Sequence, residues 1–174
     1  YYGTPAAMLV KNCELHNVLV PFGNFTTRPC PDLPHPTKPF PRGISAKGYG
    51  DSAKFTANID TTLGYEKYFK SWKRFFVSKS PELLLIRDVY ELKQGDGVDF
   101  LWQTMLPVSV SGNQAQINGK NGKCIITAPR DAEIALEEVV REKTKAGSKN
   151  VHRRLRIRKS GRTGILEILV RFIA

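Results

Sequence analysis

The chain has 174 residues, of which 41% are hydrophobic and 10% aromatic, and this composition excludes a largely disordered protein. Its net charge of +11 suits anionic partners, and no apolar run reaches the roughly 20 residues that a membrane-spanning helix requires. No signal peptide is visible at the start, and because the chain begins with Tyr1 we expect a processed or truncated piece.

The first half of the chain predicts a proline-rich loop followed by strands. Seven of the 11 prolines fall in residues 21–43, and because proline removes hydrogen-bond donors from a sheet, we expect a long surface loop there. Residues 52–59 alternate polar and apolar side chains, which is typical of a half-buried strand. Residues 67–79 and 81–92, joined by a turn at Ser80 and Pro81, predict a hairpin.

The second half predicts further antiparallel strands. Val98, Phe100 and Trp102 lie on one face of a strand, and the turn dipeptides Asn118-Gly119 and Asn121-Gly122 predict a hairpin. Residues 131–147 fit a helix by propensity and a strand by period, and the surrounding strands favour a strand that pairs with residues 151–159. With a last strand in residues 164–174, the predicted fold is all-β: a large antiparallel β-sandwich that forms a single domain over residues 1–174.

The positive charge is concentrated near the end of the chain. Residues 141–174 carry 11 basic and 2 acidic side chains, a net charge of +9. Arg154, Arg156 and Arg158 alternate with apolar residues, so in a strand they share one face at intervals of about 6 to 7 Å. A row of guanidinium groups can donate paired hydrogen bonds to sulfate, phosphate or carboxylate, and we predict that these three arginines bind an anionic substrate. The alternative is a solvated face that keeps the sheet soluble.

Residues for metal binding or catalysis are sparse. Cys13, Cys30 and Cys124 have no CxxC spacing and no paired histidine cluster, which argues against a zinc ribbon. A disulfide between Cys13 and Cys30 and three buried thiols both remain open. None of the three histidines lies in a nucleophile motif, and no glycine-rich phosphate loop is present. By its sequence alone, His16 is interpreted as a hydrogen-bonded histidine at the start of a strand.

Aromatic and basic residues interleave in residues 65–79. Most of these aromatic side chains are expected in the core, although exposed ones could stack on sugar rings or on single-stranded nucleic acid. The pattern therefore does not separate these uses.

Three segments together resemble the heparinase II/III-like polysaccharide lyases. The segment "LHNVLV" at residues 15–20 resembles the "HNTL" strand of that family, and a strand similar to "GDSAKFTANI" follows. "WKRFFVSKSPELLLIRDVYEL" then looks like the family's hairpin, which has an arginine in its first strand and an aspartate in its second. The resemblance covers residues 10–130 in this order.

This resemblance implies that the full-length protein has two domains with different roles. Family members have an N-terminal helical toroid and a C-terminal β-sandwich, and they cleave acidic polysaccharides by β-elimination next to a uronic acid carboxylate. These 174 residues would be the sandwich, without the toroid. The resemblance gives His16 the place of a structural zinc ligand, whereas the other zinc ligands and the catalytic tyrosine and histidines come from earlier sequence. We therefore assign no catalytic residue and expect no cofactor in this piece, with zinc possible only in the full-length protein.

The sequence thus leads to a first hypothesis and two rivals. The first is the β-sandwich domain of a periplasmic or secreted bacterial polysaccharide lyase, inactive alone, whose partners are an acidic polysaccharide and its own toroid domain. The second is a non-catalytic carbohydrate-binding or cell-surface module, which would require an exposed row of aromatic side chains on one sheet face. The third and least favoured is a nucleic-acid-binding domain built on the arginine strand.

Overall fold

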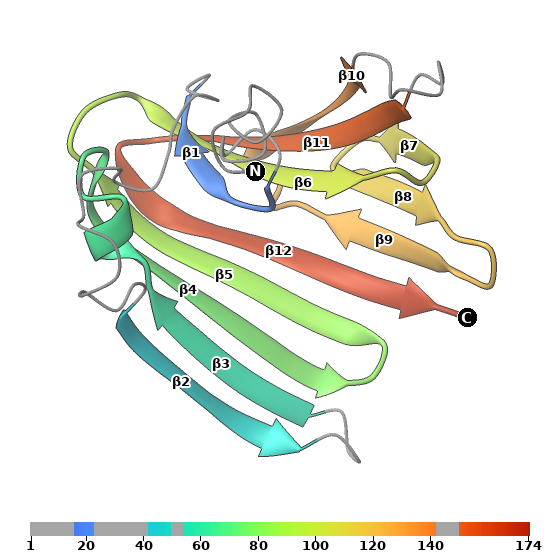
Figure 1. The fold of residues 1–174 in the computed structure, drawn as a ribbon, viewed down its shortest axis with the longest axis horizontal. Coiled ribbons are helices and arrows are strands. Elements are labelled where there is room, and N and C mark those ends of the chain that lie inside the picture. The colour runs from blue at the N-terminus through green and yellow to red at the C-terminus, as the bar shows by residue number, and fades with distance from the viewer. Residues whose placement is uncertain (1–15, 23–41, 50–53, 142–149) are drawn as a thin grey trace, which may run out of the picture.

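The computed structural model describes residues 16–22, 42–49, 54–141 and 150–174, and these residues form two antiparallel β-sheets (Figure 1). The only helical element among them is a single 3-10 turn, η3 (Thr62–Gly64). The predicted all-β class and the β-sandwich are confirmed.

The smaller sheet has four strands in the order β1-β6-β11-β10. It therefore joins the beginning, the middle and the end of the chain, because β6 pairs with β1 on one side and with β11 on the other. Its strands are β1 (Leu19–Pro21), β6 (Gly97–Thr104), β10 (Ala132–Arg141) and β11 (Asn150–Ser160).

The larger sheet has eight strands in the order β2-β3-β4-β5-β12-β9-β8-β7. The last strand of the chain lies in its interior, where β12 pairs with both β5 and β9 (Figure 1). Its strands are β2 (Arg42–Tyr49), β3 (Lys54–Asp60), β4 (Phe69–Ser80), β5 (Leu83–Leu92), β7 (Val108–Ser111), β8 (Gln114–Asn118), β9 (Lys123–Thr127) and β12 (Thr163–Ile173).

The core lies between the two sheets because alternate side chains of each strand point inward. On β12, Leu166, Ile168 and Val170 are fully buried, and on β11 Leu155 and Ile157 are fully buried as well. Full burial of a side chain of this size contributes about 1.5 to 3 kcal/mol, so the apolar members of these two strands hold the sheets together.

The predicted hairpins are confirmed. β4 ends at Ser80, and β5 pairs with it antiparallel from Leu83 onwards. β8 ends at Asn118 and β9 begins at Lys123, so the predicted turn dipeptides do connect these paired strands.

The ambiguous segment after residue 131 is a strand. β10 pairs with β11 from Ala132 opposite Lys159 to Arg141 opposite Asn150, as the alternation of apolar residues indicated. Its period-2 pattern overrides its helix propensity, because Ile134 and Leu136 lie opposite the buried Ile157 and Leu155. The connecting turn lies outside the described residues.

Three details differ from the sequence prediction. Pro21 is the last residue of β1, and residues 42–49 form β2, so both ends of the predicted loop 21–43 belong to strands. The short strand β7 was not predicted. On β6, Asp99 and Leu101 are as fully buried as Val98 and Phe100, so this strand is covered on both faces.

A buried ionic cluster connects the larger sheet to the segment before β1. Asp88 is fully buried, and it accepts hydrogen bonds from Trp72 Nε1 at 2.7 Å, Arg74 Nε at 2.7 Å and Arg74 Nη2 at 2.8 Å. Arg74 Nη1 also donates to the backbone oxygen of Asn17 at 3.0 Å. Arg74 and Asp88 are the arginine and the aspartate of the hairpin that resembles the lyase family.

Other expectations are tested only in part. Cys124 is a half-buried free thiol whose pKa is raised by burial, whereas Cys13 and Cys30 lie outside the described residues. In the described part of the chain, no helix is long and apolar enough to cross a membrane.

Candidate functional site

The three predicted anion-binding arginines do lie side by side on one face of β11. Alternation along the strand points Leu155 and Ile157 into the core and places Arg154, Arg156 and Arg158 on the opposite face. We call this set the arginine face.

Acidic residues on the neighbouring strands contact all three guanidinium groups. Arg154 donates to Glu137 Oε2 from Nε at 2.8 Å and from Nη2 at 2.5 Å, and Arg156 Nε donates to Oε1 of the same carboxylate at 2.9 Å. Arg158 donates to Asp99 from Nε at 2.8 Å and from Nη2 at 2.9 Å. Two carboxylates therefore offset two of the three positive charges.

Exposure increases along the arginine face. The side chain of Arg154 is 10% exposed, that of Arg156 is 19% exposed and that of Arg158 is 32% exposed. The hydrogen bond to the fully buried Asp99 raises the pKa of Arg158, and its guanidinium lies over the Phe22 ring at 4.6 Å. The arginine face is thus a hydrogen-bonded part of the sheet as well as a source of positive charge.

Sequence reasoning missed these two acidic partners. Asp99 carries the stronger signal, because it is a charged residue within a strand whose neighbours Val98 and Phe100 are apolar. Glu137 carries no comparable signal, since its position opposite Arg154 depends on the pairing of β10 with β11.

His16 lies in a bend before β1 rather than in the strand, which begins at Leu19. Its side chain is exposed, and the bend is held by β6: the backbone N–H of Gln103 donates to Asn17 Oδ1 at 2.7 Å, and Gln103 Nε2 donates to the His16 backbone oxygen at 3.5 Å. His152 Nε2 in turn donates to Gln103 Oε1 at 2.7 Å. Gln103 therefore links the bend before β1 to β11.

Within the described ranges, no group of three or more histidine, cysteine, aspartate or glutamate side chains is arranged to hold a metal ion. A structural zinc site takes about four ligands, so these residues do not fit a complete site. The role of His16 as one ligand stays a prediction.

The aromatic residues of β4 and the turn before it belong mainly to the core. Phe69 and Trp72 are buried with ring centroids 5.2 Å apart, and Tyr65 packs against Trp72 at 4.9 Å. The exposed Lys70 and Lys73 occupy other positions of the strand, so the interleaving of basic and aromatic residues reflects two sides of one strand.

These observations define the class of protein as an antiparallel β-sandwich with an ion-paired arginine face. The chain matches heparan sulfate lyase HepC from Pedobacter heparinus with a TM-score of 0.68 and 12% identity, over 99% of this chain and 27% of that protein. It also matches a heparinase III with methylated lysines at a TM-score of 0.65 and 9% identity, over 99% of this chain and 26% of that one.

A crystal structure of heparinase III matches at a TM-score of 0.59 and 11% identity, over 91% of this chain and 23% of that one. No family model and no curated protein sequence matches the chain. At these identities the similarity shows a shared fold, and the chain has the fold of a heparinase III domain while spanning about a quarter of the length of the solved lyases.

Proposed function

We propose that this chain is the β-sandwich domain of a heparinase II/III-like polysaccharide lyase that acts by β-elimination on a uronic-acid-containing acidic polysaccharide. The observation that carries the proposal is the agreement of 99% of the chain with part of heparan sulfate lyase HepC. The motif resemblance supports it, because Arg74, Asp88 and the bend at His16 are joined through hydrogen bonds in the structure.

In this proposal the chain supports the reaction and does not perform it. Burial, with a smaller contribution from the charge of Asp131, raises the pKa of Tyr90 to about 12, and the residue is only 2% exposed. Such a phenol is poorly suited to proton transfer with a polymer in solution. The reactive groups would come from an N-terminal toroid domain, with His16 contributing to zinc binding only in the full-length, periplasmic or secreted protein.

The substrate contact proposed for this chain is the arginine face. Arg154, Arg156 and Arg158 carry three positive charges against the two negative charges of Glu137 and Asp99, so the set retains one net positive charge. A sulfate or uronate can use the donors of Arg156 that Glu137 leaves available, because only its Nε is used in that pair.

The first test measures binding and elimination by the 174-residue chain. We expect retention on heparin-agarose or binding to a polyuronate, without formation of the ultraviolet-absorbing unsaturated product. Absence of binding to every acidic polysaccharide would contradict the proposed substrate class, and elimination by this chain alone would contradict its supporting role.

The second test concerns the arginine face, and Arg156→Gln is its cleanest variant. Removal of Arg158 would leave Asp99 buried without this partner, whereas Arg154 continues to hold Glu137 when Arg156 is replaced. We expect Arg156→Gln to weaken heparin binding roughly 3- to 10-fold at low salt. Arg130→Gln removes the same charge at an exposed position outside the arginine face and is the matched control. Equal effects of the two variants would reduce the arginine face to a solvated surface.

The geometry disfavours the rival carbohydrate-binding module. Such a module needs a row of exposed aromatic side chains, and among the residues outside β2 whose exposure the structure describes, only Phe55 and Phe172 are exposed aromatics. They lie on β3 and β12, which β4 and β5 separate in the sheet.

A further inference from the structure

A second set of basic side chains lies at one end of the larger sheet. The four are Lys54 at the start of β3, Lys79 near the end of β4, Lys123 at the start of β9 and Arg171 near the end of β12. All four residues are exposed. We call them the basic row, and Figure 1 shows the corresponding strand ends at the right-hand side of the sheet.

The strand register brings these residues together from distant parts of the sequence. Phe55 lies opposite Ser78, so the residues next to them, Lys54 and Lys79, are neighbours on adjacent strands. Arg171 lies opposite Ile125, two residues from Lys123. Since adjacent strands are about 4.8 Å apart, Lys79 on β4 and Arg171 on β12 are separated by about 10 Å of sheet.

The basic row differs from the arginine face in its electrostatic surroundings. None of its four members forms an ion pair with an acidic residue of the described chain. Glu82, in the turn between β4 and β5, is an acidic residue at the same end of the sheet. Because the four basic side chains have no acidic partner among the described residues, their positive charge is available to an external anion.

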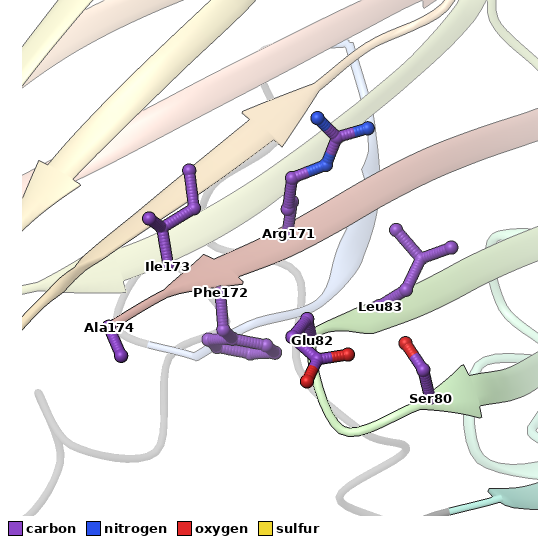
Figure 2. Close-up of a pocket in the computed structure, with 7 residues that line it drawn as sticks. All are labelled: Ser80, Glu82, Leu83, Arg171, Phe172, Ile173 and Ala174. Atoms are coloured by element: carbon purple, nitrogen blue, oxygen red, sulfur yellow. The ribbon is translucent and has the colours of Figure 1, made fainter.

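A pocket of about 440 Å³ opens at the same end (Figure 2). Its lining includes Ser80 at the end of β4, Glu82 from the turn to β5, and Arg171 and Phe172 from β12. Phe172 is 44% exposed, and its backbone N–H donates to the Glu82 backbone oxygen at 2.8 Å, which fixes the turn against β12. Figure 2 shows the Phe172 ring next to Glu82, with the Arg171 guanidinium directed away from them.

The chemistry of this end fits an anionic sugar chain. Phe172 continues the core-facing series of Ile168 and Val170, so its ring and Glu82 lie on the opposite face of the sheet from Arg171 and Lys123. The Ser80 hydroxyl can accept a hydrogen bond from a sugar hydroxyl. Ammonium and guanidinium groups in a row across the strands can pair with successive sulfates or carboxylates.

We propose that the basic row forms a second binding surface for an acidic polysaccharide, separate from the arginine face. The identity of the ligand rests on the proposed function, whereas the location rests on the geometry of this end. Because the arginine face lies on the smaller sheet and the basic row on the larger one, separate variants can test each surface.

The deciding experiment compares two triple variants with the same change of charge. Lys79, Lys123 and Arg171 are replaced by Gln in the first, and three exposed basic residues outside the basic row in the second, namely Lys67, Lys93 and Arg130. Binding of a fluorescein-labelled heparin oligosaccharide is measured by anisotropy at several salt concentrations, with thermal unfolding as the check on folding. We expect the first variant to lose about 10- to 100-fold in affinity and the second less than about 3-fold. Equal losses would overturn the proposal, because only net charge would then matter.

Phe172→Ala tests whether binding belongs to the face of the basic row, because Phe172 points to the opposite face of the sheet. We expect heparin binding to stay within about 2-fold of the unmodified chain, since the substitution removes no charge. A loss as large as that of the Lys79, Lys123 and Arg171 variant would overturn the assignment of binding to the basic row.

Two further outcomes separate this inference from the proposed function. Loss of binding on Arg156→Gln but not in the Lys79, Lys123 and Arg171 variant would overturn the second surface and leave the proposed function intact. Equally tight binding of a single-stranded DNA oligonucleotide, with the same sensitivity to the triple variant, would overturn the assignment to polysaccharide.

Discussion

Two clusters of arginine and acidic side chains, one in each sheet, differ mainly in burial. In the larger sheet, Asp88 is fully buried and the Arg74 side chain is 10% exposed, so their pair is shielded from water. In the smaller sheet, Glu137 is 28% exposed and serves two arginines at once. The comparison teaches that the same pair of residue types can form a buried ion pair that stabilises the fold or part of a surface that water and ions reach.

The largest expected effect on stability is at the buried ion pair of Arg74 and Asp88. Asp88→Asn removes the charge that Arg74 and Trp72 contact, and it leaves a buried guanidinium without its counter-ion. We expect the free energy of unfolding to fall by about 3 to 5 kcal/mol, measured by chemical denaturation. Asp96→Asn, an exposed change of the same chemistry, should stay within about 0.5 kcal/mol of the unmodified chain. A similar loss in both variants would show that the cluster has no special role.

An intermediate effect on stability is expected at the ion pair of Asp99 and Arg158, in which one partner is buried and the other is partly exposed. Asp99 is fully buried, but its partner Arg158 is 32% exposed. Because water can still reach the guanidinium, we expect Asp99→Asn to cost about 2 to 4 kcal/mol, less than Asp88→Asn in the same assay. A larger loss than that of Asp88→Asn would contradict burial as the deciding variable.

A smaller effect is expected at the arginine face itself. Glu137→Gln removes the negative charge and keeps one of the two oxygen acceptors that Arg154 and Arg156 use, so we expect a loss of about 1 kcal/mol. The same variant should bind heparin more tightly, because two guanidinium groups lose their competing carboxylate. Glu66→Gln, an exposed change in the turn before β4, is the control with the same change of net charge. An equal gain in heparin affinity for both variants would contradict competition by Glu137.

The smallest effect is expected at the exposed pair of Lys159 and Asp131. The hydrogen bond from Lys159 lowers the pKa of Asp131, so the folded state binds a proton at this site more weakly than the unfolded state does. The resulting stability is present above the unfolded pKa of about 3.9 and is lost as pH falls through the lowered folded pKa. The difference between the unmodified chain and Asp131→Asn should therefore shrink on acidification, as measured by denaturation at a series of pH values. A difference that grows in acid would reverse the sign of this linkage.

Periodicity and turn residues predicted most strands, because both are properties of short stretches of sequence. The alternation in residues 131–140 and the Asn-Gly dipeptides between β8 and β9 are of this kind. β7 was missed because it has only four residues, and β2 was missed because it follows directly on the proline-rich segment. The organisation of residues 1–174 as a single domain stays a prediction.

The sequence predicted the arginines of the candidate site but not their acidic partners. Alternation on β11 correctly placed Arg154, Arg156 and Arg158 on one face, and their role in substrate binding is still a prediction. Their carboxylate partners could not be predicted, since Asp99 lies 59 residues from Arg158 in sequence and meets it only through the pairing of β6 with β11.

By itself, then, the sequence determined most of the strands, though not β2 and β7, and which side chains of those strands share a face, because the backbone of a strand alternates its side chains with a period of two. The tertiary structure alone decided which strands are neighbours, and with them the partners of each arginine and the grouping of Lys79, Lys123 and Arg171 at one end of the sheet. The physical reason is that strand order depends on the packing of two whole sheets around a shared core, and a local pattern carries no record of what lies on the next strand.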